Sequence, residues 1–231
     1  MSWIRSLLLT AALSGCDGVS PVPAERAQPP LAVLTSLPVL FPEEFTLEAP
    51  EHPLLARLKQ DYAVRAVDGP EQLPPGGLLL AIQPRALTAE QLVALDKWVR
   101  EGGRMVLFAD SGLAWESRKA LGDPSRPPFT YPDTGLLQHW GLRLQDPATE
   151  GAEPRVIAGR EVQTVAPGSI KRAAGNCEVD AAGFVARCRL GRGTAVVIAD
   201  ADLVQVGQTG GAEGDAASNA DAVAGLIETL R

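Results

Sequence analysis

Apolar residues follow two different spacings along residues 78–109, and the change of spacing predicts a strand, a helix and a second strand. Leu78–Ile82 and Met105–Ala109 are short, continuous apolar runs, as expected of strands buried on both faces. Between them, Leu92, Leu95 and Val99 recur at helical spacing. A strand, a crossover helix and a parallel strand form a right-handed unit, so we expect residues 78–109 to form one.

The ends of the predicted helix carry local signals. Thr88 offers an N-cap, and Gln91 completes a capping box three residues later. Gly102-Gly103 ends the helix, because glycine adopts the left-handed C-terminal conformation without a steric cost. The helix is therefore expected to connect the two buried strands without a long loop.

The chain before this unit continues the alternation of strands and helices. We expect a strand over Leu31–Leu37, a short helix from Leu54 to Gln60 and a strand over Tyr62–Val67. Residues 38–52 form a loop over the carboxyl end of the first strand. The alternation over residues 31–110 is typical of an α/β protein with a doubly wound, mostly parallel sheet.

The second half of the chain is richer in short β runs. Residues at about 150–190 are predicted to be a β-rich insertion, with runs over Arg155–Ala158, Glu161–Val165, Ser169–Ala173, Cys177–Val179 and Phe184–Leu190. Thr194–Ala199 is another buried strand. Ser218 or Asn219 is expected to cap a final helix, whose apolar face carries Val223, Leu226, Ile227 and Leu230.

Two strand ends resemble each other and place acidic residues at one edge of the sheet. Asp110 follows one buried strand, and Asp200 and Asp202 follow another. If both strands are parallel, ligands would bind beyond these carboxyl ends. The candidate binding edge comprises Gln83, Arg85, Asp110, Ser111, Asp200 and Asp202. Carboxylates at strand ends also cap helices, or bind metals through oxygen; we expect no metal and no cofactor here.

The loop over residues 122–133 lies beside this edge. It contains four prolines and is not expected to form regular structure. Such a loop is either a lid over a binding site or a plain surface loop, and the sequence leaves both open.

The first sixteen residues have the pattern of a secretory signal. Arg5 supplies a positive charge, and an apolar run over residues 6–13 is too short to span a bilayer. Leu13-Ser14-Gly15-Cys16 resembles the bacterial lipobox, so residues 1–15 would be a signal peptide and Cys16 the lipidated N-terminus. An ordinary cleaved signal or a buried cysteine is the alternative. Residues 16–30 are rich in proline and charge and are predicted to be a disordered tether.

Composition and charge exclude some functions. The chain has 231 residues, a formal net charge of −7 and a pI of about 4.9, which argues against a nucleic-acid partner. Its three cysteines lack the spacing of a zinc site. Cys177 and Cys188 flank a predicted hairpin turn at Asp180–Gly183, which would bring them together. In an oxidising periplasm they would form a disulfide; the alternative is two buried thiols.

The unit from Leu79 to Asp110, and the closing stretch Gly191–Leu203 with the helix after it, resemble the auxiliary domain of uncharacterised ABC-type transport systems. Gliding-motility ABC-transporter auxiliary proteins carry this domain. The resemblance implies a flavodoxin-like or class I glutamine-amidotransferase-like fold without the catalytic residues. It also implies the permease and ATPase subunits of a transporter as partners. Commoner members carry transmembrane helices, which a lipid anchor would replace here.

Candidate catalytic groups are few. An amidotransferase needs a cysteine at the turn after the strand, where this chain has Asp110-Ser111-Gly112. Ser111 lacks the G-x-S-x-G setting of a hydrolase nucleophile, and the only histidines are His52 and His139. A site combining Ser111, His139 and Asp200 is therefore not favoured, and we assign no catalytic residue.

These observations predict a non-catalytic periplasmic lipoprotein that binds or scaffolds part of an ABC-type transport system. We expect it in the cell envelope of a Gram-negative bacterium. Asp17, directly after Cys16, resembles the inner-membrane retention signal. The alternative is a periplasmic protein that binds a small molecule or carbohydrate, or a weak hydrolase, using the carboxyl edge of the sheet.

Overall fold

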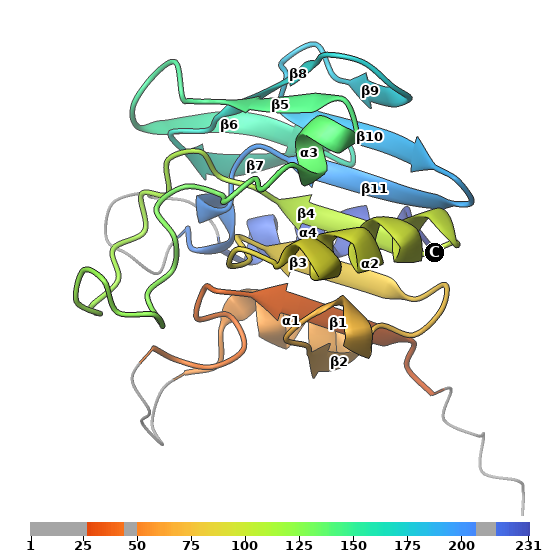
Figure 1. The fold of residues 1–231 in the computed structure, drawn as a ribbon. Coiled ribbons are helices and arrows are strands. Elements are labelled where there is room, and N and C mark those ends of the chain that lie inside the picture. The colour runs from red at the N-terminus through yellow and green to blue at the C-terminus, as the bar shows by residue number, and fades with distance from the viewer. Residues whose placement is uncertain (1–26, 44–49, 207–215) are drawn as a thin grey trace, which may run out of the picture.

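A seven-stranded sheet forms the centre of the protein in a computed structural model, which describes residues 27–43, 50–206 and 216–231 (Figure 1). The strand order is β2-β1-β3-β4-β11-β10-β9. The first five strands in this order run parallel, and β10 is antiparallel to both of its neighbours. The strands are β1 (Pro30–Thr35), β2 (Ala63–Ala66), β3 (Leu78–Ile82), β4 (Arg104–Phe108), β9 (Cys177–Val179), β10 (Val185–Leu190) and β11 (Gly193–Ile198).

Helices cover both faces of this sheet. Figure 1 shows α2 (Ala89–Arg100) in front of the sheet and α4 (Ala216–Glu228) behind it. The helix α1 (Pro53–Asp61) packs against α4 on the rear face. The mixed α/β class with a mostly parallel central sheet, predicted from the sequence, is therefore confirmed. Within the described ranges, no helix is long and apolar enough to cross a membrane.

The unit over residues 78–108 folds as its pattern predicts. All five residues of β3 are buried, and so are four of the five residues of β4. The Thr88 side chain accepts a hydrogen bond from the Gln91 N–H at 3.3 Å, and the Gln91 side chain accepts one from the Thr88 N–H at 3.1 Å. Gly102 has a φ of 114°, which only glycine adopts readily.

The β-rich region divides into three parts. A hairpin of β6 (Ala152–Ile157) and β7 (Arg160–Val165) forms one small sheet, and β5 (Leu142–Gln145) pairs with β8 (Ser169–Arg172) in another. In contrast, β9 and β10 extend the central sheet beyond β11. The short helix α3 (Leu136–His139) precedes β5, and the 3-10 helices η1 (Pro70–Gln72) and η2 (Asp202–Val204) lie in connections.

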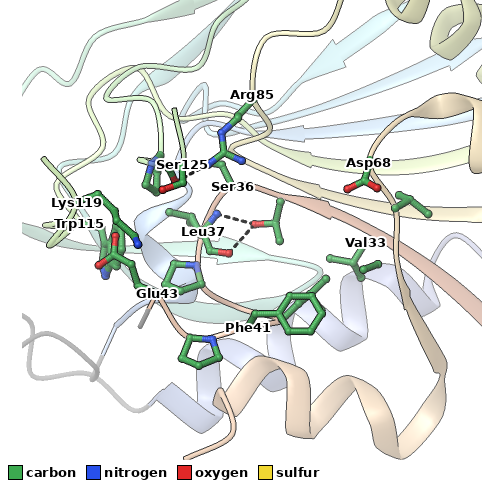
Figure 2. A pocket seen from close by; sticks show the side chains of 17 residues that line it. Val33, Ser36, Leu37, Phe41, Glu43, Asp68, Arg85, Trp115, Lys119 and Ser125 are labelled. Carbon is green, nitrogen blue, oxygen red and sulfur yellow. Dashed lines mark hydrogen bonds between the residues drawn. The ribbon is translucent and has the colours of Figure 1, made fainter. Parts of the chain in front are cut away.

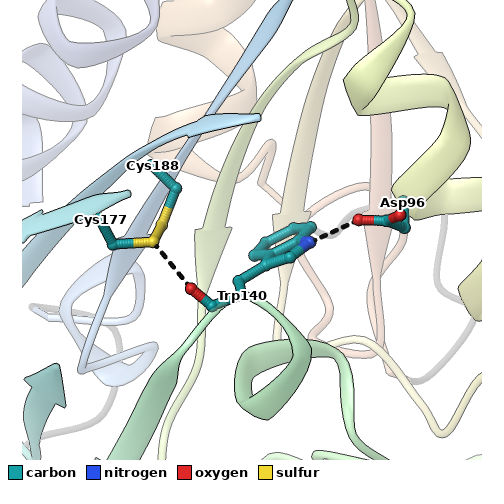
Figure 3. The surroundings of a disulfide bond; sticks show 4 residues. All are labelled: Asp96, Trp140, Cys177 and Cys188. Atoms are coloured by element: carbon teal, nitrogen blue, oxygen red, sulfur yellow. Dashed lines mark hydrogen bonds between the residues drawn. A yellow bond between two sulfur atoms is a disulfide. The ribbon is translucent and has the colours of Figure 1, made fainter. Parts of the chain in front are cut away.

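A disulfide joins Cys177 on β9 to Cys188 on β10, as the hairpin interpretation predicted. The two residues are directly paired across the antiparallel strands. Figure 3 shows the bridge beside Trp140: the Cys177 sulfur lies 3.3 Å from the Trp140 carbonyl oxygen, and the Trp140 indole N–H donates to Asp96 at 2.8 Å. The bridge therefore fastens the edge of the central sheet at a buried position.

The prediction that Ser218 or Asn219 caps the last helix is wrong. The helix α4 includes Ala216, and Asn219 lies inside it with its side chain buried. The Asn219 amide donates to the carbonyl oxygens of Gln163 and Leu203, both at 2.8 Å, and accepts from the Gln163 N–H at 3.0 Å. Asn219 therefore ties α4 to β7 and η2, an interaction between segments distant in sequence.

Candidate functional site

The strand-end acids predicted from the sequence do lie together at the carboxyl edge of the sheet. Strands β4 and β11 are parallel neighbours, with Phe108 opposite Ile198. Asp110 and Asp200 follow these residues and are fully buried, and Asp202 is 3% exposed. The edge carries the predicted carboxylates, but they face the interior of the protein.

Asp110 and Asp200 bind backbone N–H groups through both of their carboxylate oxygens. Asp110 accepts hydrogen bonds from Gly112 at 2.8 Å and from Ala201 at 2.9 Å. Asp200 accepts from Leu203 at 2.8 Å and from Val165 at 3.1 Å. These bonds connect the ends of β4, β11 and β7.

Asp202 connects the same edge to the loop that follows β4. Its two oxygens accept hydrogen bonds from the N–H groups of Ala114 at 2.6 Å and Trp115 at 2.8 Å. The three acids thus supply six acceptors for backbone donors, of which the Ala201 and Leu203 N–H groups are buried. In the part of the chain that the structure describes, no group of three or more His, Cys, Asp or Glu side chains is placed to hold a metal ion.

Burial changes the acidity of these carboxyls. It raises the pKa of Asp110, and it raises the pKa of Asp202 to about 7. The pKa of Asp200 is raised well above its usual value by burial and by the neighbouring charges of Asp110 and Asp202. The backbone N–H groups act in the opposite direction, because they stabilise the ionised form.

Gln83, at the end of β3, forms hydrogen bonds to several segments at this edge. It is buried and has a φ of 41°, an uncommon backbone conformation for a residue other than glycine. Its side chain donates to the carbonyl oxygens of Asp110 at 3.2 Å and Pro128 at 3.3 Å, and accepts from the Asp110 N–H at 2.9 Å. The Ser36 hydroxyl donates to the Gln83 carbonyl oxygen. Gln83 therefore links β1, β3, β4 and the loop over residues 122–133.

Ser111 and the two histidines do not form a catalytic arrangement. The Ser111 hydroxyl donates to the Gln145 carbonyl oxygen at 3.0 Å. His139 lies with its Nε2 3.3 Å from an Arg100 nitrogen and 3.6 Å from an Asp96 oxygen. His52 caps α1, because its Nδ1 accepts the Leu54 N–H at 3.1 Å. The structure thus gives all three side chains partners other than one another.

Arg85 is the member of the predicted edge that faces solvent. Its guanidinium donates to the Ser125 carbonyl oxygen and lines a groove of about 390 Å³ (Figure 2). The groove lies at the carboxyl ends of β1, β2 and β3. Between β1 and β3 the chain reverses its direction of winding, since β1 leads to β2 on one side and β3 leads to β4 on the other. Such switch points are where open parallel sheets bind ligands.

Sequence reasoning identified part of this switch-point groove. It predicted Arg85, the 122–133 loop and a loop over the end of the first strand, all of which contribute lining residues. It missed Asp68, Trp115 and Lys119, which stand in irregular segments without a motif. Further members of the lining are Val33, Thr35, Ser36, Leu37, Phe41, Glu43, Val67, Ser125 and Pro127.

Solved structures with a similar fold are distant in sequence. The mmIFT52 N-terminal domain is 14% identical with a TM-score of 0.52, over 87% of this chain and 98% of that one. A β-galactosidase from Rahnella sp. R3 is 14% identical with a TM-score of 0.51, over 89% of this chain. The chain spans about a third (32%) of the length of that galactosidase. At this identity the likeness concerns the fold alone. Among curated proteins there is no match.

A family model matches the N-terminal and central parts of the chain. The model described as "ABC-type uncharacterized transport system" matches residues 28–164, more than half of the chain. The match begins just before β1, includes β3, α2 and β4, and ends within β7. It therefore contains the switch-point groove, Gln83 and Asp110. The chain belongs to the ABC-type uncharacterized transport system auxiliary family.

Proposed function

We propose that this chain is a non-catalytic, lipid-anchored component of an ABC-type transport system, acting in the periplasm as a binding or scaffolding subunit. The observation that carries the proposal is the family match over residues 28–164. Its partners would be the permease and ATPase subunits of the transporter. The exposed carboxyl edge around Arg85 is the surface we assign to binding.

The chemistry of the edge supports a role without catalysis. A general acid or base must exchange a proton with a substrate, and a nucleophile needs a base beside it. Asp110 and Asp200 instead use both oxygens to bind backbone N–H groups, and Ser111 donates to a backbone carbonyl. These residues therefore stabilise the fold.

The disulfide and the position of β1 support the proposed location. The Cys177–Cys188 bridge suits an oxidising compartment such as the periplasm. Cys16, the proposed lipidation site, lies outside the described residues. Strand β1 begins at Pro30, at the edge of the sheet opposite the groove, so an anchor before it leaves the groove free to face away from the membrane.

Affinity purification of the full chain tests the proposal. With a C-terminal tag and mild detergent, we expect an ABC-type ATPase and a permease to copurify from membranes of the native host. An unrelated lipoprotein with the same tag, expressed at the same level, serves as the control. Recovery of the chain from membranes without either subunit, also after chemical crosslinking, would overturn the proposed association.

A further inference from the structure

The switch-point groove contains two cationic side chains, Arg85 and Lys119, that form no salt bridge with any residue in the described ranges. The Arg85 guanidinium is exposed and donates only to the Ser125 carbonyl oxygen within the described ranges. The half-buried Lys119 ammonium makes no hydrogen bond or salt bridge to any residue that the structure describes. Both line the same groove. The lining also carries two acids, Glu43 and Asp68.

The acidic residues near these cations bind other groups. Glu43 accepts hydrogen bonds from the Ser117 hydroxyl and from the Arg118 N–H, the latter at 2.9 Å. Asp123 accepts from the Ser125 N–H at 2.7 Å and from its hydroxyl at 2.6 Å. The Ser125 hydrogen bonds are the main cause of the lowered pKa of Asp123, and the charges of Lys119 and Arg85 lower it further. An incoming anion would therefore find donors that are still available.

The other end of the groove has different chemistry. Figure 2 shows Lys119 on one side of Leu37 and Asp68 on the other, with the Phe41 ring below Leu37 in this view. Asp68 is exposed, and its carboxylate has no hydrogen-bond partner among residues 27–43, 50–206 and 216–231. Phe41 is 71% exposed, so its ring is open to contact with a ligand. The groove thus offers two cations, an apolar ring and a carboxylate among its lining residues.

We infer that this groove binds a small hydroxylated carboxylate of the sugar-acid class. The ligand's carboxylate would lie between Arg85 and Lys119, because a guanidinium matches a carboxylate in geometry and charge. Its hydroxyl groups would donate to Asp68, since an ionised carboxylate only accepts hydrogen bonds. The C–H face of its ring would pack on Phe41. The volume of about 390 Å³ is within the range of small-molecule sites, which are about 300–1,000 Å³.

This combination excludes simpler ligands as good occupants. A neutral sugar would leave Arg85 and Lys119 without an anion, and a bare anion would not reach Asp68 or Phe41. The inference goes beyond the proposed function and does not depend on association with a transporter, because it rests on the groove alone.

Calorimetric titration of the purified full chain in detergent tests the inference, with glucuronate as the probe. Glucose tests the ring without the charge, and acetate tests the charge without the ring. We expect glucuronate to bind, and glucose and acetate to bind at least about tenfold more weakly, a difference of about 1.4 kcal/mol. Binding of glucuronate should also weaken as salt is added, because its charge contributes.

Single substitutions test which groove residues contact the carboxylate of the ligand and which contact its hydroxyl groups. Arg85→Gln and Lys119→Gln should each weaken glucuronate binding by about tenfold, the usual effect of losing a charge-assisted hydrogen bond. Asp68→Asn should weaken glucuronate but leave acetate unchanged. Arg143→Gln, an exposed arginine on β5 outside the groove, is the matched control and should bind like the wild type. Unfolding midpoints measured on every variant confirm that the fold is retained.

Three results would overturn the inference. The first is no binding of glucuronate by the folded chain. The second is acetate or inorganic phosphate binding as tightly as glucuronate, which would indicate a general anion site. The third is glucose binding equally well. Each of these would leave copurification with the ATPase and permease unaffected, so the two proposals fail separately.

Discussion

The carboxylate of Asp110 accepts a hydrogen bond from the backbone N–H of Ala201 at 2.9 Å, and this bond joins the end of β4 to the end of β11. A second bond from the Gly112 N–H, at 2.8 Å, fixes the turn that follows β4. In the sequence, the acids after these strands suggest a ligand site. In the folded chain they hold the strand ends and loops of the carboxyl edge together.

Replacing Asp110 by alanine should therefore destabilise the fold. The substitution removes both acceptors and leaves the buried Ala201 N–H and the partly buried Gly112 N–H without this partner, which costs about 2–4 kcal/mol in the free energy of unfolding. Urea denaturation measures this change. Asp146→Ala, at an exposed aspartate after β5, is the matched control and should stay within about 0.5 kcal/mol of the wild type. Equal stabilities of the two variants would show that Asp110 is dispensable.

Asp202 should make the stability depend on pH. Burial raises the pKa of Asp202 to about 7, compared with about 3.9 in an unfolded chain. Between these values the folded state holds more protons than the unfolded state. The stabilising contribution of this group is therefore complete below about pH 4 and is lost as the pH rises through about 7. Asp202→Asn has no titrating group at this position and should lack this decline.

The comparison between wild type and Asp202→Asn is the decisive measurement, because His52 acts in the opposite direction. Burial lowers the pKa of His52 to about 4, so its contribution to stability increases with pH over the same range. Urea denaturation at several pH values from about 4 to about 7 gives both slopes. We expect the free energy of unfolding to fall more steeply, or rise less, with pH in the wild type than in the variant. Parallel slopes would contradict a raised pKa.

The sequence predicted the central sheet because its strands are short apolar runs between recognisable helix caps. Leu78–Ile82 shows this best, since burial on both faces leaves no position for a polar side chain. The proximity of Asp110 and Asp200 was predictable for a related reason, since the carboxyl ends of parallel strands share an edge. Periodicity and topology were sufficient for both conclusions.

Other features depend on contacts that no local pattern encodes. Asn219 is a favourable capping residue by type, but its amide instead binds the Gln163 backbone, a contact across 56 residues of sequence. The burial of the acids was likewise not predictable, because their partners include Val165 and Trp115 from distant segments. The groove is formed by irregular loops around Arg85, and Lys119 and Asp68 approach it only in the folded chain.

Removing the disulfide should cost stability without changing the fold. The bridge closes a segment with a sequence separation of 11, for which the loss of loop entropy in the unfolded chain corresponds to about 3 kcal/mol. The double variant Cys177→Ala and Cys188→Ala, in a Cys16→Ser background, should lose about this free energy of unfolding. A thiol reductant should destabilise the Cys16→Ser chain and leave the double variant unchanged. Insensitivity of both proteins to reductant would show that the cysteines are not bridged in the cell.

Attachment of the chain to the membrane should depend on lipidation of Cys16 alone. Metabolic labelling with palmitate is expected to mark the wild type, because the thiol of the lipobox cysteine accepts the diacylglyceryl group. Cys16→Ser should lose the label and move from the membrane to the soluble fraction. A Cys177→Ala variant, which retains Cys16, is the control and should stay labelled and membrane-bound. A membrane-bound Cys16→Ser chain would indicate an uncleaved signal segment or another mode of attachment.

Gln83 should control the order of the loop over residues 122–133. In Gln83→Ala the Asp110 N–H and the carbonyl oxygens of Asp110 and Pro128 lose their side-chain partner, so the loop loses a buried connection to the end of β3. Alanine also keeps the unfavourable positive φ. We expect a loss of about 2–3 kcal/mol in the free energy of unfolding and faster hydrogen exchange at Leu113 and Tyr131, whose N–H groups bond within this region. Gln138→Ala, at an exposed glutamine on α3, is the matched control. If exchange accelerated over the whole sheet rather than at this loop, Gln83 would be a global stability residue, and its assignment as the local link between β3 and the groove would be wrong.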